Sequence, residues 1–142
     1  MERRDFIRLS VASAGASLIA PAITSAAAGK PVPPAADLYY TKEAPGRWAG
    51  KVATHLPNIE ISKTADSVTV KIVTPHEMKG YEHYIVKHVL LDKDYKFLNE
   101  QLFDPTKDSV PSSEFSLKSY TGTIFAVSMC NKHDVWVNSA EV

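Results

Sequence analysis

Residues 58–73 read NIEISKTADSVTVKIV, and this stretch decides the fold class. Apolar side chains occupy every second position on either side of a polar break, at Ile59, Ile61, Val68, Val70 and Ile72. Such alternation places one face of an extended segment in a core and the other in solvent. The polar break at 64–66 favours a turn. The stretch therefore predicts two strands, 58–63 and 67–73, joined as a hairpin.

The rest of the chain repeats this pattern of short extended segments separated by turn-forming residues. Further strands are predicted at 83–91, 96–103, 114–119, 123–129 and 134–138. Only residues 39–50, which include Pro45 and Gly46, lack a clear pattern. About seven short strands without a sustained helical period predict an all-β protein, an immunoglobulin-like antiparallel β-sandwich.

The N-terminal residues have the pattern of an export signal. Glu2-Arg3-Arg4-Asp5-Phe6-Ile7-Arg8 contains a twin arginine, and a weakly apolar stretch rich in Ala and Ser follows it up to Ala28. We expect residues 1–28 to be a twin-arginine signal peptide, 29–36 a Pro-rich linker and 37–142 one domain. An uncleaved anchor is the alternative. The expected location is the periplasm, or another compartment reached by this export route.

The balance of charge excludes several kinds of partner. The chain contains 16 Lys and Arg residues against 16 Asp and Glu residues. A nucleic-acid-binding protein carries a basic stripe, and a helix that binds a membrane surface carries a basic polar face. Neither pattern is present, so we expect no nucleic-acid partner and no membrane span in the mature protein.

Cys130 is the single cysteine, so it cannot form a disulfide within the chain. It lies three residues before His133, and a Cys-x-x-His turn brings both donor atoms to one ion. His55 lies two residues before Pro57 and His76 directly follows Pro75, each next to a predicted strand end, where side chains project from loops. One thiol with several imidazoles predicts a metal site. A buried cysteine that merely neighbours surface histidines is the alternative.

The two remaining histidines are separated by strand parity. If residues 83–91 form one strand, His83 and His88 are five positions apart and point to opposite faces. They are then not expected to share a metal ion. We interpret His88 as a structural histidine.

Three motifs in this order resemble the superoxide reductases, the family of neelaredoxins and of the desulfoferrodoxin iron centre. They are His55-Leu56-Pro57, then His76 followed by Glu82-His83-Tyr84-Ile85, and finally Cys130-Asn131-Lys132-His133. The resemblance spans about residues 40–142. No Cys-rich iron module precedes these motifs, so the chain resembles the one-iron form.

The resemblance implies the cofactor, the reaction and the partners. It implies one mononuclear iron, Fe2+ or Fe3+, with a sixth position left open. Its ligands would be the nitrogens of His55, His76, His83 and His133 and the axial thiolate of Cys130. The implied activity is one-electron reduction of superoxide to hydrogen peroxide, with an electron donor such as a rubredoxin-like or cytochrome-like protein. Assembly into a homo-oligomer is also possible on this resemblance.

The chain departs from the family just before its first histidine motif. The family commonly has Glu-Lys there, and this chain has Ala53 and Thr54. A cation near an open site attracts an anionic substrate. Other lysines are therefore candidates for this role, namely Lys51, Lys79 and Lys132.

Two other kinds of metal protein remain as alternatives. A small exported blue-copper protein uses one Cys and two His on a β-sandwich, usually with a Met beyond the second His. The chain has only Met1, Met78 and Met129, and none follows His133. The second alternative is a β-sandwich that binds a metal without catalysis, although structural zinc takes four ligands rather than five.

Overall fold

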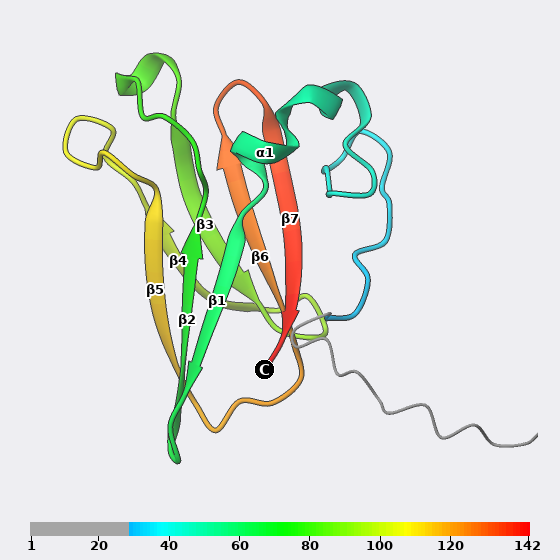
Figure 1. Ribbon diagram of the computed structural model, residues 1–142, viewed down its shortest axis with the longest axis vertical. Coiled ribbons are helices and arrows are strands. Elements are labelled where there is room, and N and C mark those ends of the chain that lie inside the picture. Colours follow the sequence, from blue (N-terminus) through cyan, green and yellow to red (C-terminus); the bar gives the residue numbers. More distant parts are fainter. Residues whose placement is uncertain (1–28) are drawn as a thin grey trace, which may run out of the picture.

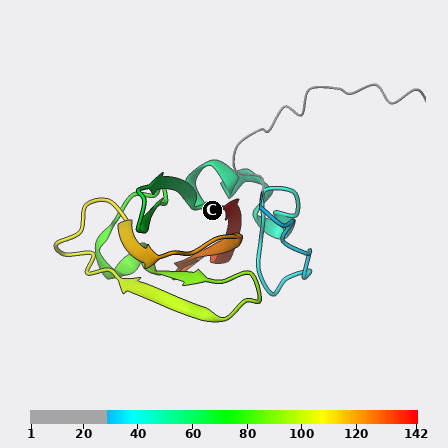
Figure 2. The ribbon, with the colours of Figure 1, turned by 90° about the horizontal axis from the view of Figure 1, so that it is seen from below.

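The computed structural model describes residues 29–142, so the predicted signal peptide lies outside the described residues. The described strands are β1 (Asn58–Lys63), β2 (Ser67–Val73), β3 (Ile85–Leu91), β4 (Phe97–Leu102), β5 (Ser112–Lys118), β6 (Thr123–Cys130) and β7 (Asp134–Glu141). They form two antiparallel sheets, in the orders β1-β2-β5 and β4-β3-β6-β7. Figure 2 shows the two sheets as facing layers. The predicted antiparallel β-sandwich of seven strands is confirmed.

The opening hairpin has the predicted strand bounds. β1 and β2 pair from Asn58 opposite Val73 to Lys63 opposite Val68. The apolar side chains of β2 are buried against residues of β5 and β6, among them Phe115, Ile124 and Ala126. Burial of apolar surface between the sheets is the main favourable contribution to folding. The alternation in the sequence therefore identified the inner face of this sheet.

The other five strands differ from their predicted bounds by one to three residues at one or both ends, among them β3 and β7. The strand predicted over residues 83–91 begins at Ile85, and its pairing with β6 shifts register between Ile85 and Lys87. The residues before it form part of a loop that contains η3 (Gly80–Glu82). At the other end of the chain, β7 continues to Glu141 because Glu141 still pairs with Thr123 of β6.

The segment before β1 lies against the edge and the outer face of the larger sheet. The backbone N–H of Tyr40 donates to the carbonyl of Val135, and the N–H of Val137 donates to the carbonyl of Tyr40. Tyr39 and Val32 cover part of the outer apolar face, beside a groove of about 500 Å³. Within residues 29–142, no helix has both the length and the apolar composition that crossing a membrane requires.

Three connecting segments meet at one end of the sandwich (Figure 1). One is α1 (Val52–His55), which follows η2 (Gly46–Lys51) and leads into β1. The second is the turn between β6 and β7, and the third is the loop around η3. All the predicted metal ligands lie in or beside these segments, so the fold brings them to the same end.

Candidate metal centre

Five side chains that are far apart in the sequence converge at this end of the sandwich. Their possible ligand atoms all lie within 4.8 Å of one another. We call this group the histidine–cysteine cluster; it consists of His55, His76, His83, Cys130 and His133. These are the five ligands that the resemblance implies.

The nitrogens of the cluster are spaced like the corners of a square. Nε2 of His55 lies 3.0 Å from Nδ1 of His133, which lies 3.1 Å from Nε2 of His83. Nε2 of His83 in turn lies 3.0 Å from Nε2 of His76. A square closed on these three edges places His133 and His76 at opposite corners. The sulfur of Cys130 lies 3.6 Å from the His133 nitrogen and 3.8 Å from the His76 nitrogen, which places it near the axis of the square.

These separations fit a square arrangement of imidazoles better than a tetrahedral one. Two nitrogens bound at about 2.1 Å and at right angles to each other are separated by about 3.0 Å, whereas tetrahedral angles give about 3.4 Å. The three printed edges agree with the first value. Nδ1 of His133 and Nε2 of His83 each approach two other nitrogens, although a neutral ring nitrogen has only one proton or one lone pair. A central cation would accept all the lone pairs at once, so the donor set fits a metal ion.

The electrostatics of the cluster keep its imidazoles neutral. Burial, with a further contribution from neighbouring imidazoles, lowers the pKa of His55 and that of His76 to about 4. Burial also lowers the pKa of His83 and of His133, and nearby lysines act in the same direction. Neutral imidazoles present the free lone pairs that a metal requires.

Cys130 behaves differently from the imidazoles. Burial raises the pKa of its thiol, while the backbone amides of Lys132 and His133 oppose this rise. Without a metal the thiol therefore stays protonated at neutral pH. The charge of a bound metal ion favours the thiolate, as it does for coordinating thiols in general.

His55 is the last residue of α1, rather than a loop residue as the sequence suggested. Its Nδ1 lies 3.2 Å from the carbonyl oxygen of Lys51, one turn earlier, and 2.8 Å from Oγ1 of Thr54. A hydrogen bond from Nδ1 to that carbonyl leaves Nε2 without a proton and directed into the cluster. The short helix therefore sets both the position and the tautomer of this ring.

Asn131 ties the His83 loop to the turn that carries Cys130. Its Oδ1 accepts a hydrogen bond from the backbone N–H of Tyr84 at 2.9 Å, and its Nδ2 donates to the carbonyls of Tyr81 and Glu82. The Asn131 backbone N–H also donates to the carbonyl of Tyr84. The Cys-x-x-His motif, which predicted metal ligation by Cys130 and His133, thus also contains Asn131, which holds the loop of His83 in place. Its position beside Cys130 was visible in the sequence, but its partners were not.

The loop from His76 to His83 closes on itself before it reaches β3. The N–H of Lys79 donates to the carbonyl of His83 at 2.9 Å, and Gly80 adopts a φ of +56° between them. Nothing lies within 4 Å of the position of a Cβ atom at Gly80, so the glycine is needed for its backbone conformation rather than for space.

Sequence reasoning missed a contact between η2 and the His133 turn. The Trp48 ring meets the His133 ring edge-on, with 4.7 Å between ring centroids. Trp48 Nε1 donates to a carboxylate oxygen of Asp134 at 2.8 Å, and Arg47 pairs with the same oxygen. Asp134 has a φ of +62°, an uncommon conformation for a residue with a side chain. These contacts hold η2 beside His133, and no motif in the sequence indicated them.

The three candidate lysines all lie close enough to lower the pKa of His83. Two of them have acidic partners: Lys79 pairs with Glu77 at 3.1 Å, and Lys132 pairs with Glu82 at 3.8 Å. In the described part of the chain, Lys51 has no carboxylate within 4.0 Å, and its charge also lowers the pKa of His133. Lys132 acts on the same two histidines, so the absence of a carboxylate partner is what distinguishes Lys51 among the three candidates.

His88 lies outside the cluster, as predicted, but the predicted reason is wrong. His83 precedes β3, and the register shift after Ile85 breaks the simple alternation from one end of the segment to the other. His88 instead points between the sheets, where it is 0% exposed and lies 2.8 Å from both Oγ1 of Thr74 and Oγ of Ser113. It is a buried histidine with both ring nitrogens satisfied.

The burial of His88 predicts a pH dependence for the stability of the metal-free protein. Burial lowers its pKa from the ordinary value of 6.5 to about 4. Between these values the unfolded chain binds a proton that the folded protein does not, so stability falls as the pH is lowered through this window. The loss from this residue is about 3 kcal/mol when complete. His55 and His76 act in the same direction.

Urea unfolding of metal-free protein at several pH values between 7 and 4 measures this dependence. The His88→Gln variant, which does not titrate there, should lose less stability over the window than the wild type. Equal slopes for the two proteins would contradict the assignment of the pH dependence to His88.

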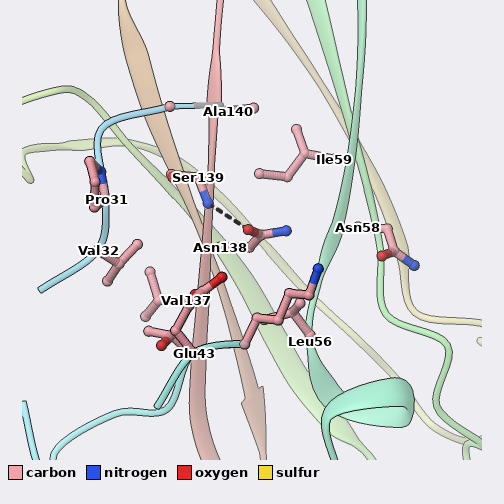
Figure 3. Close-up of a pocket in the computed structure, with 13 residues that line it drawn as sticks. Pro31, Val32, Glu43, Leu56, Asn58, Ile59, Val137, Asn138, Ser139 and Ala140 are labelled. Carbon is pink, nitrogen blue, oxygen red and sulfur yellow. Dashed lines mark hydrogen bonds between the residues drawn. The ribbon is translucent and has the colours of Figure 1, made fainter. Parts of the chain in front are cut away.

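A separate groove of about 740 Å³ lies between the edge strands β1 and β7. Figure 3 shows Leu56 and Ile59 on one side of it, and Val137 and Ala140 on the other. None of the cluster residues lines it. The Asn138 side chain, which lines this groove, forms a hydrogen bond within the protein: its Nδ2 donates to the carbonyl of Pro57 at 2.9 Å. The groove and the cluster are therefore separate features.

Comparison with known structures gives several matches. A superoxide reductase (neelaredoxin) from Ignicoccus hospitalis, in a single-residue variant, matches with a TM-score of 0.64 and 28% identity, over 74% of this chain and 93% of that one. A crystal structure of an oxidised superoxide reductase matches with a TM-score of 0.57 and 26% identity, over 74% and 96% of the two chains.

More distant matches agree in fold alone. The superoxide reductase from Nanoarchaeum equitans matches with a TM-score of 0.55 and 20% identity, over 63% of this chain and 94% of that one. No match was found among curated protein sequences.

The remaining comparison is with protein-family models. The model described as desulfoferrodoxin matches residues 47–139, a range that contains every residue of the histidine–cysteine cluster. Because this match covers more than half of the chain, the protein belongs to the desulfoferrodoxin family.

Proposed function

We propose that the protein is an exported superoxide reductase with one mononuclear iron held by four imidazole nitrogens and one thiolate. The observation that carries this proposal is the spacing of the cluster, with nitrogens 3.0 to 3.1 Å apart and the Cys130 sulfur near the axis of their square. Imidazole and thiolate are both ligands that iron accepts. The names of the solved structures that the chain resembles support the same activity.

The alternatives fit the donor set less well. A blue-copper site uses two histidines and one cysteine in a trigonal arrangement with a weak axial ligand. Structural zinc uses four ligands at tetrahedral angles. Neither accounts for five convergent donor atoms, three pairs of which have the separation expected at right angles.

The five residues of the histidine–cysteine cluster would hold the metal ion, and two of their rings are more exposed than the other two. The rings of His55 and His76 are buried, at 2% and 7% exposure, whereas His83 and His133 are only half-buried. Bound iron would supply the electron that, with two protons, converts superoxide to hydrogen peroxide, and an external one-electron donor would restore it. A superoxide anion that approached the side of the cluster opposite Cys130 would meet neutral imidazoles. These neutral rings do not themselves attract the anion.

The attraction of superoxide is assigned to Lys51. Its ammonium group has no acidic partner within 4.0 Å among the described residues, and its charge, like that of Lys132, acts on both half-buried histidines. A cation at this position raises the local concentration of an anionic substrate. Lys79 and Lys132 are secondary candidates, because nearby glutamates offset part of their charge.

The test combines metal analysis with a superoxide assay. We expect purified protein without its first 28 residues to contain about one iron per chain, a count set by a cluster that has five donor atoms. Oxidation should produce a visible thiolate-to-iron absorption, and the reduced protein should consume superoxide with about one hydrogen peroxide per superoxide. Stoichiometric copper, or an oxygen yield typical of dismutation, would contradict the proposal.

Export is part of the proposal and has its own measurement. Expression of the full chain in a bacterium should give protein in the periplasm, and Arg3→Lys together with Arg4→Lys should keep it in the cytoplasm. The twin-arginine pair is the feature that this export route reads. Equal periplasmic amounts of the two proteins would contradict this route.

A further inference from the structure

Four polar side chains form a continuous hydrogen-bonded chain inside the sandwich, near the cluster. Oγ1 of Thr74 lies 2.8 Å from Nε2 of His88 and 2.8 Å from Oγ of Ser128, and Nδ1 of His88 lies 2.8 Å from Oγ of Ser113. All four side chains are buried. We call this group the buried polar chain; it consists of Ser113, His88, Thr74 and Ser128.

The buried polar chain joins both sheets. Ser113 lies on β5 and Thr74 follows β2, both in the smaller sheet, whereas His88 and Ser128 lie on β3 and β6 of the larger one. Apolar contacts between sheets have no preferred direction. Hydrogen bonds do have one, and they weaken when donor and acceptor move apart. The chain therefore fixes the relative position of the two sheets at this level.

One end of the buried polar chain, formed by Thr74 and Ser128, leads directly to two cluster residues. Thr74 lies two residues before His76, and its carbonyl accepts a hydrogen bond from the His76 N–H at 2.8 Å. Ser128 lies two residues before Cys130 on β6. The Thr74–Ser128 bond thus links the segment that presents His76 to the strand that presents Cys130.

A second contact connects His88 to the same sulfur. The His88 ring meets the Phe103 ring edge-on, with 4.9 Å between centroids, and Phe103 packs in one apolar cluster with Cys130 and Ile85. Ser113, at the other end of the buried polar chain, has no such connection, because β5 carries no cluster residue. The two ends of the chain should therefore differ in their effect on the metal site.

We propose that Thr74 and His88 are positioning residues that hold the imidazole of His76 at the correct distance from the thiolate of Cys130. This inference rests on the metal site of the proposed function, although not on its reaction. His76 lies in the loop that follows β2 of the smaller sheet, and Cys130 ends β6 of the larger one, so their 3.8 Å separation depends on how the sheets are held together. Loss of the link leaves the two ligands on independently moving segments.

The experiment compares two variants that each remove one hydroxyl from the buried polar chain. Thr74→Val removes the hydroxyl that links the buried polar chain to the segments of His76 and Cys130. Ser113→Ala removes the hydroxyl at the other end of the chain, which contacts Nδ1 of His88. Each variant leaves a nitrogen of His88 unpaired, so both should lower the thermal midpoint of the metal-free protein. Co2+ titration, followed by thiolate absorption, should show affinity about ten-fold lower for Thr74→Val and nearly unchanged for Ser113→Ala.

Two substitutions of His88 provide a test by rescue. The amide of His88→Gln can reach the position of Nε2 and so restore the bond to Thr74, whereas the shorter His88→Asn reaches only the position of Nδ1, next to Ser113. We expect the glutamine variant to bind Co2+ more tightly than the asparagine variant. The reverse order, or equal affinities for the two, would overturn the proposal.

A measurement on metal-free protein separates this inference from the proposed function. Cys130 is 6% exposed, so alkylation of its thiol reports how well its surroundings are held. We expect the Cys130 thiol to be alkylated several-fold faster in Thr74→Val than in Ser113→Ala. Each variant is measured at the same number of degrees below its own thermal midpoint. Equal rates would overturn the positioning role, even if the wild type bound no metal. A wild type that binds Co2+ but does not reduce superoxide would contradict the proposed function alone.

Discussion

Replacement of Cys130 by serine is expected to abolish both the visible thiolate absorption and the reduction of superoxide. The sulfur lies 3.6 Å from the His133 nitrogen and 3.8 Å from the His76 nitrogen, so it would hold the metal ion together with these imidazoles. A thiolate donates more electron density to iron than any other side chain in the cluster. A serine hydroxyl is not ionised at neutral pH, so it does not replace this donation.

The same substitution should leave the fold intact. Serine is nearly isosteric with cysteine, and the cost of burying its hydroxyl beside Ile85 and Phe103 is about 1 to 3 kcal/mol. Circular dichroism and thermal unfolding of the metal-free variant check this point. The prediction would be contradicted by a folded, iron-loaded Cys130→Ser variant that kept the absorption band or a rate near that of the wild type.

Removal of the Lys51 charge is expected to slow superoxide consumption about ten-fold at low ionic strength, within the range known for electrostatic steering. Lys51 acts on both half-buried histidines and has no carboxylate partner in the described part of the chain. The measurement is the second-order rate of Lys51→Ala against the wild type by pulse radiolysis or stopped flow. High salt screens the charge, so the difference between the two proteins should shrink as salt is added.

The chain offers matched controls for this prediction. Lys79→Ala and Lys132→Ala remove the same charge but also free Glu77 or Glu82, respectively, from an ion pair near the cluster. Lys51→Arg keeps the charge and should keep most of the rate. A larger loss for Lys79→Ala than for Lys51→Ala would show that the cation was assigned to the wrong residue.

Much of the fold followed from local patterns. Alternation between residues 58 and 73 predicted a hairpin with the observed bounds, because the apolar positions of each strand are less exposed than most of the polar positions between them. The bounds were less accurate at β3, where residues 83 and 84 belong to the loop that follows η3 and the pairing with β6 shifts register after Ile85. Such irregularities depend on pairing with β6, which alternation within one strand does not reveal.

The candidate site, like the fold, was predicted only in part from the sequence. The identities of five possible ligands, and the exclusion of His88, followed from residue types, spacing and a family resemblance. The parity argument for His88 was nevertheless wrong, because His83 lies in a loop whose direction is set by Asn131. The roles of Trp48 and Asp134 had no sequence signal, since they join segments more than 80 residues apart.

The sequence by itself determined the class of fold, the family and the chemical types of the ligands, because these depend on periodicity and on motifs of a few residues. The tertiary structure decided the separations between the imidazole nitrogens, the distances of the sulfur from two of them and, among the three candidate lysines, which one has no carboxylate within 4.0 Å in the described part of the chain. These features depend on distances between segments carried by different sheets. Such distances are set by packing and by long-range hydrogen bonds, so no local stretch of the chain contains them.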